Sequence, residues 1–176
     1  MPRTWLLVLA CGCQKLFGID TFAVADAGSD APPDALLTCP SAYQQSKLTQ
    51  TYYSMSGTTT RTWLAAEIAC ELDNDAAYTG HTHLLVIDSP TELETLAMDG
   101  FWIGATDRVT VGDYIWVTAD PSPFNASYWS SNEPNMQDIE KCVSYDQTMH
   151  VTTTMCGLSH SYICECDSYP AQSGRF

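Results

Sequence analysis

Apolar side chains recur at helical spacing in residues 62–72, where Trp63, Ala66, Ile68 and Cys70 form a mixed apolar face. The polar pair Asn74-Asp75 follows and is typical of a helix end. The pattern predicts a first helix over residues 62–72.

A second helix is predicted by its start signal at Ser89. Pro90 occupies the first helical position, and Glu92 completes a Ser-x-x-Glu capping box. We expect this helix to run to about residue 98.

Short apolar runs bounded by turn residues predict strands. They cover residues 84–87, 101–104, 114–117, 142–145 and 161–166. Residues 119–139, in contrast, are rich in Pro, Asn, Ser and Asp and show no periodicity. An ordered loop of that length is usually functional. Two helices, several short strands and one long loop indicate a small α+β domain.

The beginning of the chain has the pattern of an export signal. A short positive segment precedes the apolar residues 4–10, which are far fewer than the roughly 20 that a membrane-spanning helix requires. A small residue then precedes both Cys11 and Cys13, as in a bacterial lipoprotein signal whose cysteine becomes lipidated. We predict a leader over residues 1–13 with Cys13, or Cys11, as the lipidated residue. The alternative is an ordinary cleaved signal.

The remaining chain divides into three parts. Residues 14–38 are rich in Ala, Asp and Pro and are predicted to form a disordered tether. The domain itself is predicted over residues 39–167, and residues 168–176 form a tail. This organisation predicts an exported protein, either a lipoprotein of the bacterial outer membrane and cell surface or a secreted protein. The membrane would be reached only through the N-terminal lipid.

Charge restricts the class of partner. Seven Lys and Arg against 21 Asp and Glu give a net charge of −14, which argues against nucleic acid because phosphate binding needs cationic side chains. Acidic side chains can bind calcium, or they can simply keep a surface solvated. The chain has no nucleophile elbow, phosphate loop or HExxH motif, so the sequence predicts no enzyme.

Six cysteines lie in the predicted domain, and none forms a CxxC pair. Widely spaced cysteines of even number in an exported chain indicate disulfides, although six allow fifteen pairings. Cys164 and Cys166 are two residues apart on one predicted strand and therefore point to the same face.

Seven motifs follow one another between Cys39 and Cys166. They are the Trp-x-x-Ala-x-x-x-Cys pattern of residues 63–70, LLVIDSPTE at residues 84–92, Trp102-Ile103-Gly104, Trp116, Trp129, Glu133-Pro134-Asn135 and Tyr162-Ile163-Cys164-Glu165. In this order the motifs resemble the C-type lectin-like domain family. The resemblance implies an α+β fold with two helices, short antiparallel strands, a long irregular loop and disulfides.

The resemblance also implies the disulfide pairing. The two bridges of the family correspond to Cys70–Cys164 and Cys142–Cys156. Because the family's fold places its first and last strands side by side, we predict Cys39–Cys166 as a third bridge. A free thiol pair or an intermolecular bridge is the alternative.

In sugar-binding members of the family, one calcium ion bridges the protein and two sugar hydroxyls. The resemblance assigns Glu133 and Asn135 to this site, with Pro134 in a cis peptide bond between them. Glu140, two residues before Cys142, is the third ligand position. The motif that these residues form is associated with mannose-type sugars.

Two further ligand positions of the family depart from its pattern. An Asn-Asp pair is replaced here by Thr152 and Thr153, and a hydroxyl is a poorer calcium ligand than a carboxylate. The resemblance therefore implies a degenerate site with weak calcium binding at most. A secondary calcium site retains Asp107, but Val111 and Lys141 occupy two of its other positions.

Two functions remain open at this point. The first is a carbohydrate-binding module for a mannose-type glycan, in which Tyr128 or Trp129 could stack on a sugar ring, although packing in the core is the favoured role of Trp129. The second is a calcium-independent module that binds a protein or another surface. His81 and His83 share one face of a strand and could bind a metal, but the sequence shows no third ligand.

Overall fold

The structure is a computed structural model of the 176-residue chain, and it describes residues 36–46, 51–89, 92, 100–120, 128–135, 138–146 and 150–176. The predicted leader, nearly all of the tether and most of the second predicted helix lie outside these residues. Glu92 is helical, but the extent of its helix is not described. Among the described residues, no helix is both long and apolar enough to cross a membrane.

One helix, α1, spans Trp63–Glu71 and confirms the first predicted helix. Trp63, Ala66 and Cys70 face the core as expected, and Glu67 is buried beside them. Ile68 was predicted on the apolar face, and this was wrong, because its side chain is 48% exposed. The face that α1 buries is therefore narrower and more polar than the sequence pattern indicated.

In the part of the chain that the structure describes, eight strands form the sheet: β1 (Gln44–Gln45), β2 (Tyr52–Met55), β3 (His81–Leu84), β4 (Phe101–Thr106), β5 (Ile115–Trp116), β6 (Cys142–Tyr145), β7 (Val151–Thr154) and β8 (Ser161–Asp167). The main path runs β1-β2-β8-β4-β6-β7, while β3 pairs with β8 and β5 with β4. The predicted strands match β4, β5, β6 and β8 within a few residues. Residues 84–87 are buried as expected, but the strand there, β3, begins and ends three residues earlier.

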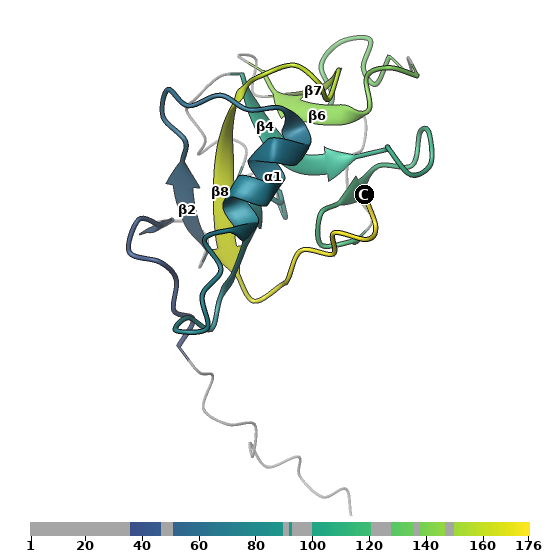
Figure 1. Ribbon diagram of the computed structural model, residues 1–176. Coiled ribbons are helices and arrows are strands. Elements are labelled where there is room, and N and C mark those ends of the chain that lie inside the picture. Colours follow the sequence, from purple (N-terminus) through teal and green to yellow (C-terminus); the bar gives the residue numbers. More distant parts are fainter. Residues whose placement is uncertain are drawn as a thin grey trace, which may run out of the picture. The chain divides into compact units, whose positions relative to one another are not determined.

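Strand β8 is the centre of this arrangement. It pairs antiparallel with both β2 and β3, and its first residues pair in parallel with β4. Figure 1 shows β8 between β2 and β4, with α1 lying across the sheet. Side chains that alternate along β8 therefore meet elements from the whole length of the domain.

The Trp102-Ile103-Gly104 motif lies on β4, and its glycine has a steric reason. A Cβ atom added at Gly104 would lie 2.8 Å from the Leu84 carbonyl oxygen and 2.9 Å from a methyl group of Val117. The Gly104 amide donates to Leu85 O at 2.7 Å, and the Gly104 carbonyl accepts from the Val117 amide at 2.7 Å. The missing side chain lets two neighbouring segments contact the β4 backbone.

Three disulfides link these elements in the predicted pairing. Cys70–Cys164 joins α1 to β8, Cys142–Cys156 connects β6 to the segment after β7, and Cys39–Cys166 joins the start of the described domain to β8. Cys164 and Cys166 share one face of β8, as their spacing indicated. Because three disulfides are typical of an oxidising compartment, the fold fits an extracellular or secreted protein.

Candidate functional site

The loop before β6 brings together three side chains that the sequence singled out. The Asn135 side-chain amide donates to Glu133 Oε1 at 3.4 Å and also donates to Glu140 Oε2. The backbone amide of Asn135 donates to Glu133 Oε2 at 3.1 Å. The peptide bond between Glu133 and Pro134 is cis, as the resemblance implied. We call Glu133, Asn135 and Glu140 the loop carboxylate site.

Strand β7 forms the wall of this site. The backbone amide of Thr153 donates to Glu133 Oε2 at 3.0 Å, and its hydroxyl donates to the same oxygen. The Thr152 hydroxyl donates instead to the carbonyl of Thr153 at 3.4 Å. All five predicted positions therefore lie in one region, but Thr153 already uses the carboxylate that a cation would need.

The Asn135 amide has a particular role in this arrangement. Its NH₂ group lies between two carboxylates and is the positive end of a dipole, so it reduces their mutual repulsion. A calcium ion would need the amide oxygen there instead, because calcium binds oxygen ligands. Rotation of the amide by half a turn would exchange the two atoms.

The electrostatics of the site act on the aromatic side chains beneath it. Burial, followed by the charges of Asp107, Glu133 and Glu140, raises the pKa of Tyr114 well above its usual range. Tyr114 packs edge-on against Trp129 with ring centroids 5.0 Å apart. The negative charge of the loop carboxylate site is therefore felt by the buried aromatic side chain of Tyr114.

Neither of the aromatic residues suggested for sugar stacking presents a ring to solvent. Tyr128 is 6% exposed and Trp129 is 9% exposed, and both belong to the core. The suggested stacking on Tyr128 is therefore wrong, whereas core packing, the favoured role of Trp129, is confirmed. A ligand at the site would meet mainly polar groups.

Comparison with known proteins decides the family. A model of the Lectin C-type domain matches residues 59–166, which is more than half of the chain. The chain belongs to the C-type lectin domain family.

Individual relatives agree with this assignment. The human "C-type lectin domain family 17, member A" is 28% identical over 134 residues, covering 73% of this chain and 32% of the relative. Lectin BRA-3 of the barnacle Megabalanus rosa is 31% identical over 110 residues, covering 58% and 64%. The chain thus spans roughly one to two thirds of the length of these relatives. Both come from animals, and the predicted bacterial leader stays a prediction.

A solved structure extends the likeness to three dimensions. The carbohydrate-recognition domain of cow CD23, crystallised in the presence of a GlcNAc2Man3 oligosaccharide, is 27% identical with a TM-score of 0.61. The match covers 73% of this chain and 95% of that one. The described domain is therefore a lectin-like module with the C-type lectin fold.

The secondary calcium position of the family is used differently in this lectin-like module. Asp107 is 4% exposed, and its Oδ2 accepts from the Gly112 amide at 2.8 Å. Val111 is half exposed, and Lys141 contributes its carbonyl oxygen to the Asp107 amide at 3.1 Å. Asp107 therefore stabilises a turn, and neither neighbour supplies a carboxylate ligand.

A second polar cluster, which sequence reasoning missed, lies between β3 and β8. The His83 Nε2 atom is 3.2 Å from Asp167 Oδ1, and Glu165 lies beside them. His81, the predicted partner of His83, is exposed and lies outside the cluster. The alternation of Glu165 and Asp167 with two cysteines along β8 was visible in the sequence, but the pairing of β8 with β3 was not.

Burial governs the protonation of this second cluster. For His83 burial lowers the pKa, but the hydrogen bond to Asp167 and the charges of Glu165 and Asp167 together raise it to about 9. Burial raises the pKa of Glu165 well above its usual range. In the absence of other ligands, protons therefore neutralise the cluster.

Proposed function

We propose that this chain is a carbohydrate-recognition module whose ligand surface is the loop carboxylate site. The observation that carries the proposal is the convergence of Glu133, Asn135 and Glu140 at one partly exposed position of a lectin-like fold. The same proposal makes the module a binding protein without catalysis of its own.

The polar groups of the site suit the hydroxyls of a sugar. A pair of adjacent hydroxyls can donate to the two carboxylates and accept from the Asn135 amide. Hydrogen bonds to charged acceptors are roughly twice as strong as neutral ones. The motif of residues 133–135 favours a mannose-type glycan as this ligand.

Calcium binding at the site is proposed to be weak. Glu133, Asn135 and Glu140 offer fewer oxygens than the 6–8 that calcium takes, and Thr153 occupies one of them. We expect a dissociation constant at or above the 10⁻⁴–10⁻³ M range of extracellular calcium modules, as an order-of-magnitude estimate.

The test is isothermal titration with calcium and then with methyl mannoside. The double variant Thr152→Asn/Thr153→Asp supplies an amide and a carboxylate, so it should bind calcium at least tenfold more tightly, an order-of-magnitude estimate from the added ligand charge. It should also show stronger sugar binding than the wild type. Adding Glu140→Gln to this variant should abolish the gain, whereas the matched control Glu71→Gln on α1 should leave it intact.

A second function is favoured by the hydrogen bonds between Thr153 and Glu133. They satisfy the carboxylate without a metal, as a calcium-independent module that binds a protein or another surface would require. If the restored variant binds neither calcium nor sugar, the carbohydrate proposal fails. A glycan array probed with and without calcium then separates the two functions. A protein-binding module should bind no glycan on the array in either condition.

We also propose that the module is held at a membrane by a lipid on Cys13 or Cys11, both outside the described residues. Support comes from the leader pattern and from the extracellular character of the disulfides. Cys13→Ser or Cys11→Ser should release the protein from the membrane fraction. Retention of both variants, with no lipid label on the wild type, would contradict the anchor.

A further inference from the structure

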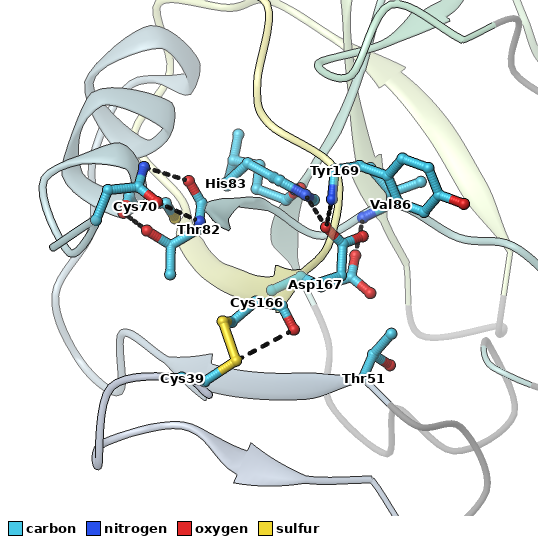
Figure 2. Close-up of polar contacts among 12 residues, drawn as sticks. Cys39, Thr51, Cys70, Thr82, His83, Val86, Cys166, Asp167 and Tyr169 are labelled. Carbon is cyan, nitrogen blue, oxygen red and sulfur yellow. Dashed lines mark hydrogen bonds and ion pairs between the residues drawn. A yellow bond between two sulfur atoms is a disulfide. The ribbon is translucent and has the colours of Figure 1, made fainter. Parts of the chain in front are cut away.

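Three ligand-type side chains converge between β3 and β8, and none of them belongs to the loop carboxylate site. His83, Glu165 and Asp167 offer one nitrogen and two carboxylates, with one ligand atom from each within 4.8 Å of the others. All three residues are buried. We call them the β3–β8 triad. Figure 2 shows His83 pointing at the Asp167 carboxylate.

A backbone hydrogen bond at Nδ1 fixes the orientation of the His83 imidazole. His83 Nδ1 lies 2.8 Å from the carbonyl oxygen of Leu84, which can only accept, so Nδ1 carries a proton. In the neutral ring Nε2 then presents a lone pair to the carboxylate oxygens. The Nε2 lone pair and the carboxylate oxygens repel one another unless a proton or a metal ion lies between them. A histidine whose far nitrogen donates to a backbone carbonyl is also the usual form of a metal ligand.

Glu165 supplies an independent sign of a missing partner. Its Oε2 accepts from the Val86 amide at 2.8 Å, whereas Oε1 is buried without a hydrogen-bond partner among the described residues. Glu165 is only 1% exposed, so water does not replace that partner at the surface. An unsatisfied buried oxygen is costly and calls for a specific explanation.

Charge points to a divalent cation. With a neutral imidazole the triad carries two negative charges in a buried place, and buried charge must be neutralised. Two protons can do this, and so can one divalent ion. Glu67, Asp88 and Glu92 act electrostatically on members of the triad, which makes the surrounding potential still more negative if they are ionised.

We infer that the β3–β8 triad is a binding site for one zinc ion, held by His83 Nε2 and one carboxylate oxygen each from Glu165 and Asp167. Zinc accepts nitrogen and carboxylate ligands in a tetrahedron, with a fourth position left for water. Manganese and iron also bind nitrogen and carboxylate ligands, but zinc binds such ligands more tightly.

The distances are compatible with zinc after a small adjustment. Bonds of about 2.0–2.1 Å place tetrahedral ligand atoms about 3.3–3.4 Å apart. The His83–Asp167 pair is already at 3.2 Å. The triad's ligand atoms lie within 4.8 Å of one another, so the Glu165 carboxylate would have to move closer to complete the tetrahedron.

A route for the ion and its water exists. Asp167 lines a surface hollow of about 380 Å³, together with Asp88, Asp120 and Tyr169. Its three carboxylates attract cations to the entrance. Bound zinc would link β3 to β8 on the face of β8 opposite to its two disulfides.

The experiment is titration of the chelator-treated full chain, disulfides intact, with zinc by calorimetry and with cobalt by visible absorption. We expect one tight site per chain, a tetrahedral cobalt spectrum, proton release and a raised melting temperature. Glu165→Gln retains an acceptor for the Val86 amide but removes a zinc ligand. It should weaken zinc binding by at least about 100-fold, because losing a residue that only supports a ligand already costs up to about 100-fold. His83→Gln should do the same.

Two controls separate this site from other acidic or histidine positions. His81→Gln changes the exposed histidine on the same strand, and Glu133→Gln changes the loop carboxylate site; both should retain the zinc site. Absence of zinc binding by the folded wild type would overturn the inference and leave the triad as a proton-holding cluster. So would unchanged affinity in a folded Glu165→Gln protein, as checked by circular dichroism.

Discussion

The loop carboxylate site and the β3–β8 triad contain the same kinds of groups in opposite environments. At the loop, Glu133 and Glu140 are partly exposed and share the Asn135 side-chain amide as a partner. At the triad, Glu165 and Asp167 are buried and fixed by His83 and by backbone amides. A partly exposed carboxylate keeps some of its hydration in the folded state, whereas the ionisation of a buried carboxylate is coupled to folding. Mutations in the two regions should therefore have different consequences.

The largest expected difference concerns the disulfides of the two regions. Cys70–Cys164 closes a loop with a sequence separation of 94, and Cys142–Cys156 one of 14. Chain entropy predicts a loss of about 4–5 kcal/mol for Cys70→Ala/Cys164→Ala and about 3 kcal/mol for Cys142→Ala/Cys156→Ala. Denaturant unfolding of both double variants measures the difference. Equal losses, or a larger loss at the loop side, would contradict it.

The next effect is the pH dependence of the buried region in metal-free buffer. Glu67, on α1, has a pKa raised by burial to about 7 from 4.5, so folding favours its protonated form. Stability should therefore fall as pH rises from about 4.5 to 7. His83, with a pKa raised to about 9 from 6.5, stabilises the fold below pH 6.5 and loses this contribution as pH rises to 9.

Glu67→Gln tests the first of these windows. The variant keeps an acceptor for the Leu84 amide but cannot ionise, so its unfolding free energy above pH 7 should exceed that of the wild type by on the order of 3 kcal/mol. Urea unfolding from pH 4 to 9 measures both slopes. Glu133→Gln serves as the partly exposed control, and a wild type that is most stable at pH 8 would refute the expected sign.

The smallest expected effect is at the loop. Because Glu140 is partly exposed and its partner is a neutral amide, Glu140→Gln should change the unfolding free energy by less than about 0.5 kcal/mol. The same variant should lose whatever heat of calcium binding the wild type shows. A stability loss above about 1 kcal/mol would mean that the loop carboxylates, like the buried ones, mainly serve the fold.

Much of the fold was predictable because its strongest signals are local. The Trp-x-x-Ala-x-x-x-Cys pattern placed α1, and the motif order implied the disulfides that the structure contains. Strands β2 and β7 were missed because Tyr52–Met55 and Val151–Thr154 show no apolar alternation strong enough to stand out. Only tertiary pairing with β8 and β6 makes these segments strands.

The two polar sites differ in how much of them the sequence contains. Glu133, Asn135 and Glu140 are close in the chain, so a motif could identify them. The inward direction of the Asn135 amide and the bonds from Thr153 depend on packing and could not be predicted. The triad joins His83 to residues more than 80 positions later, so only the register His83↔Glu165 reveals it.

The Cys39–Cys166 bridge, finally, gives the domain a mechanical property. It connects the first and last parts of the described fold across 127 positions of sequence and lies against Gly80, where an added Cβ would be 2.5 Å from Cys166 Sγ. Tension applied to the chain on either side of the domain passes from Cys39 to Cys166 through one covalent bond. Most of the sheet and α1 lie between these two cysteines and are bypassed by the bond. On the C-terminal side, tension first acts on the contact of Phe176 with Trp63 and on the hydrogen bond from the Gln172 amide to the Val117 carbonyl. A recognition surface between the two cysteines keeps its shape while its attachment is pulled.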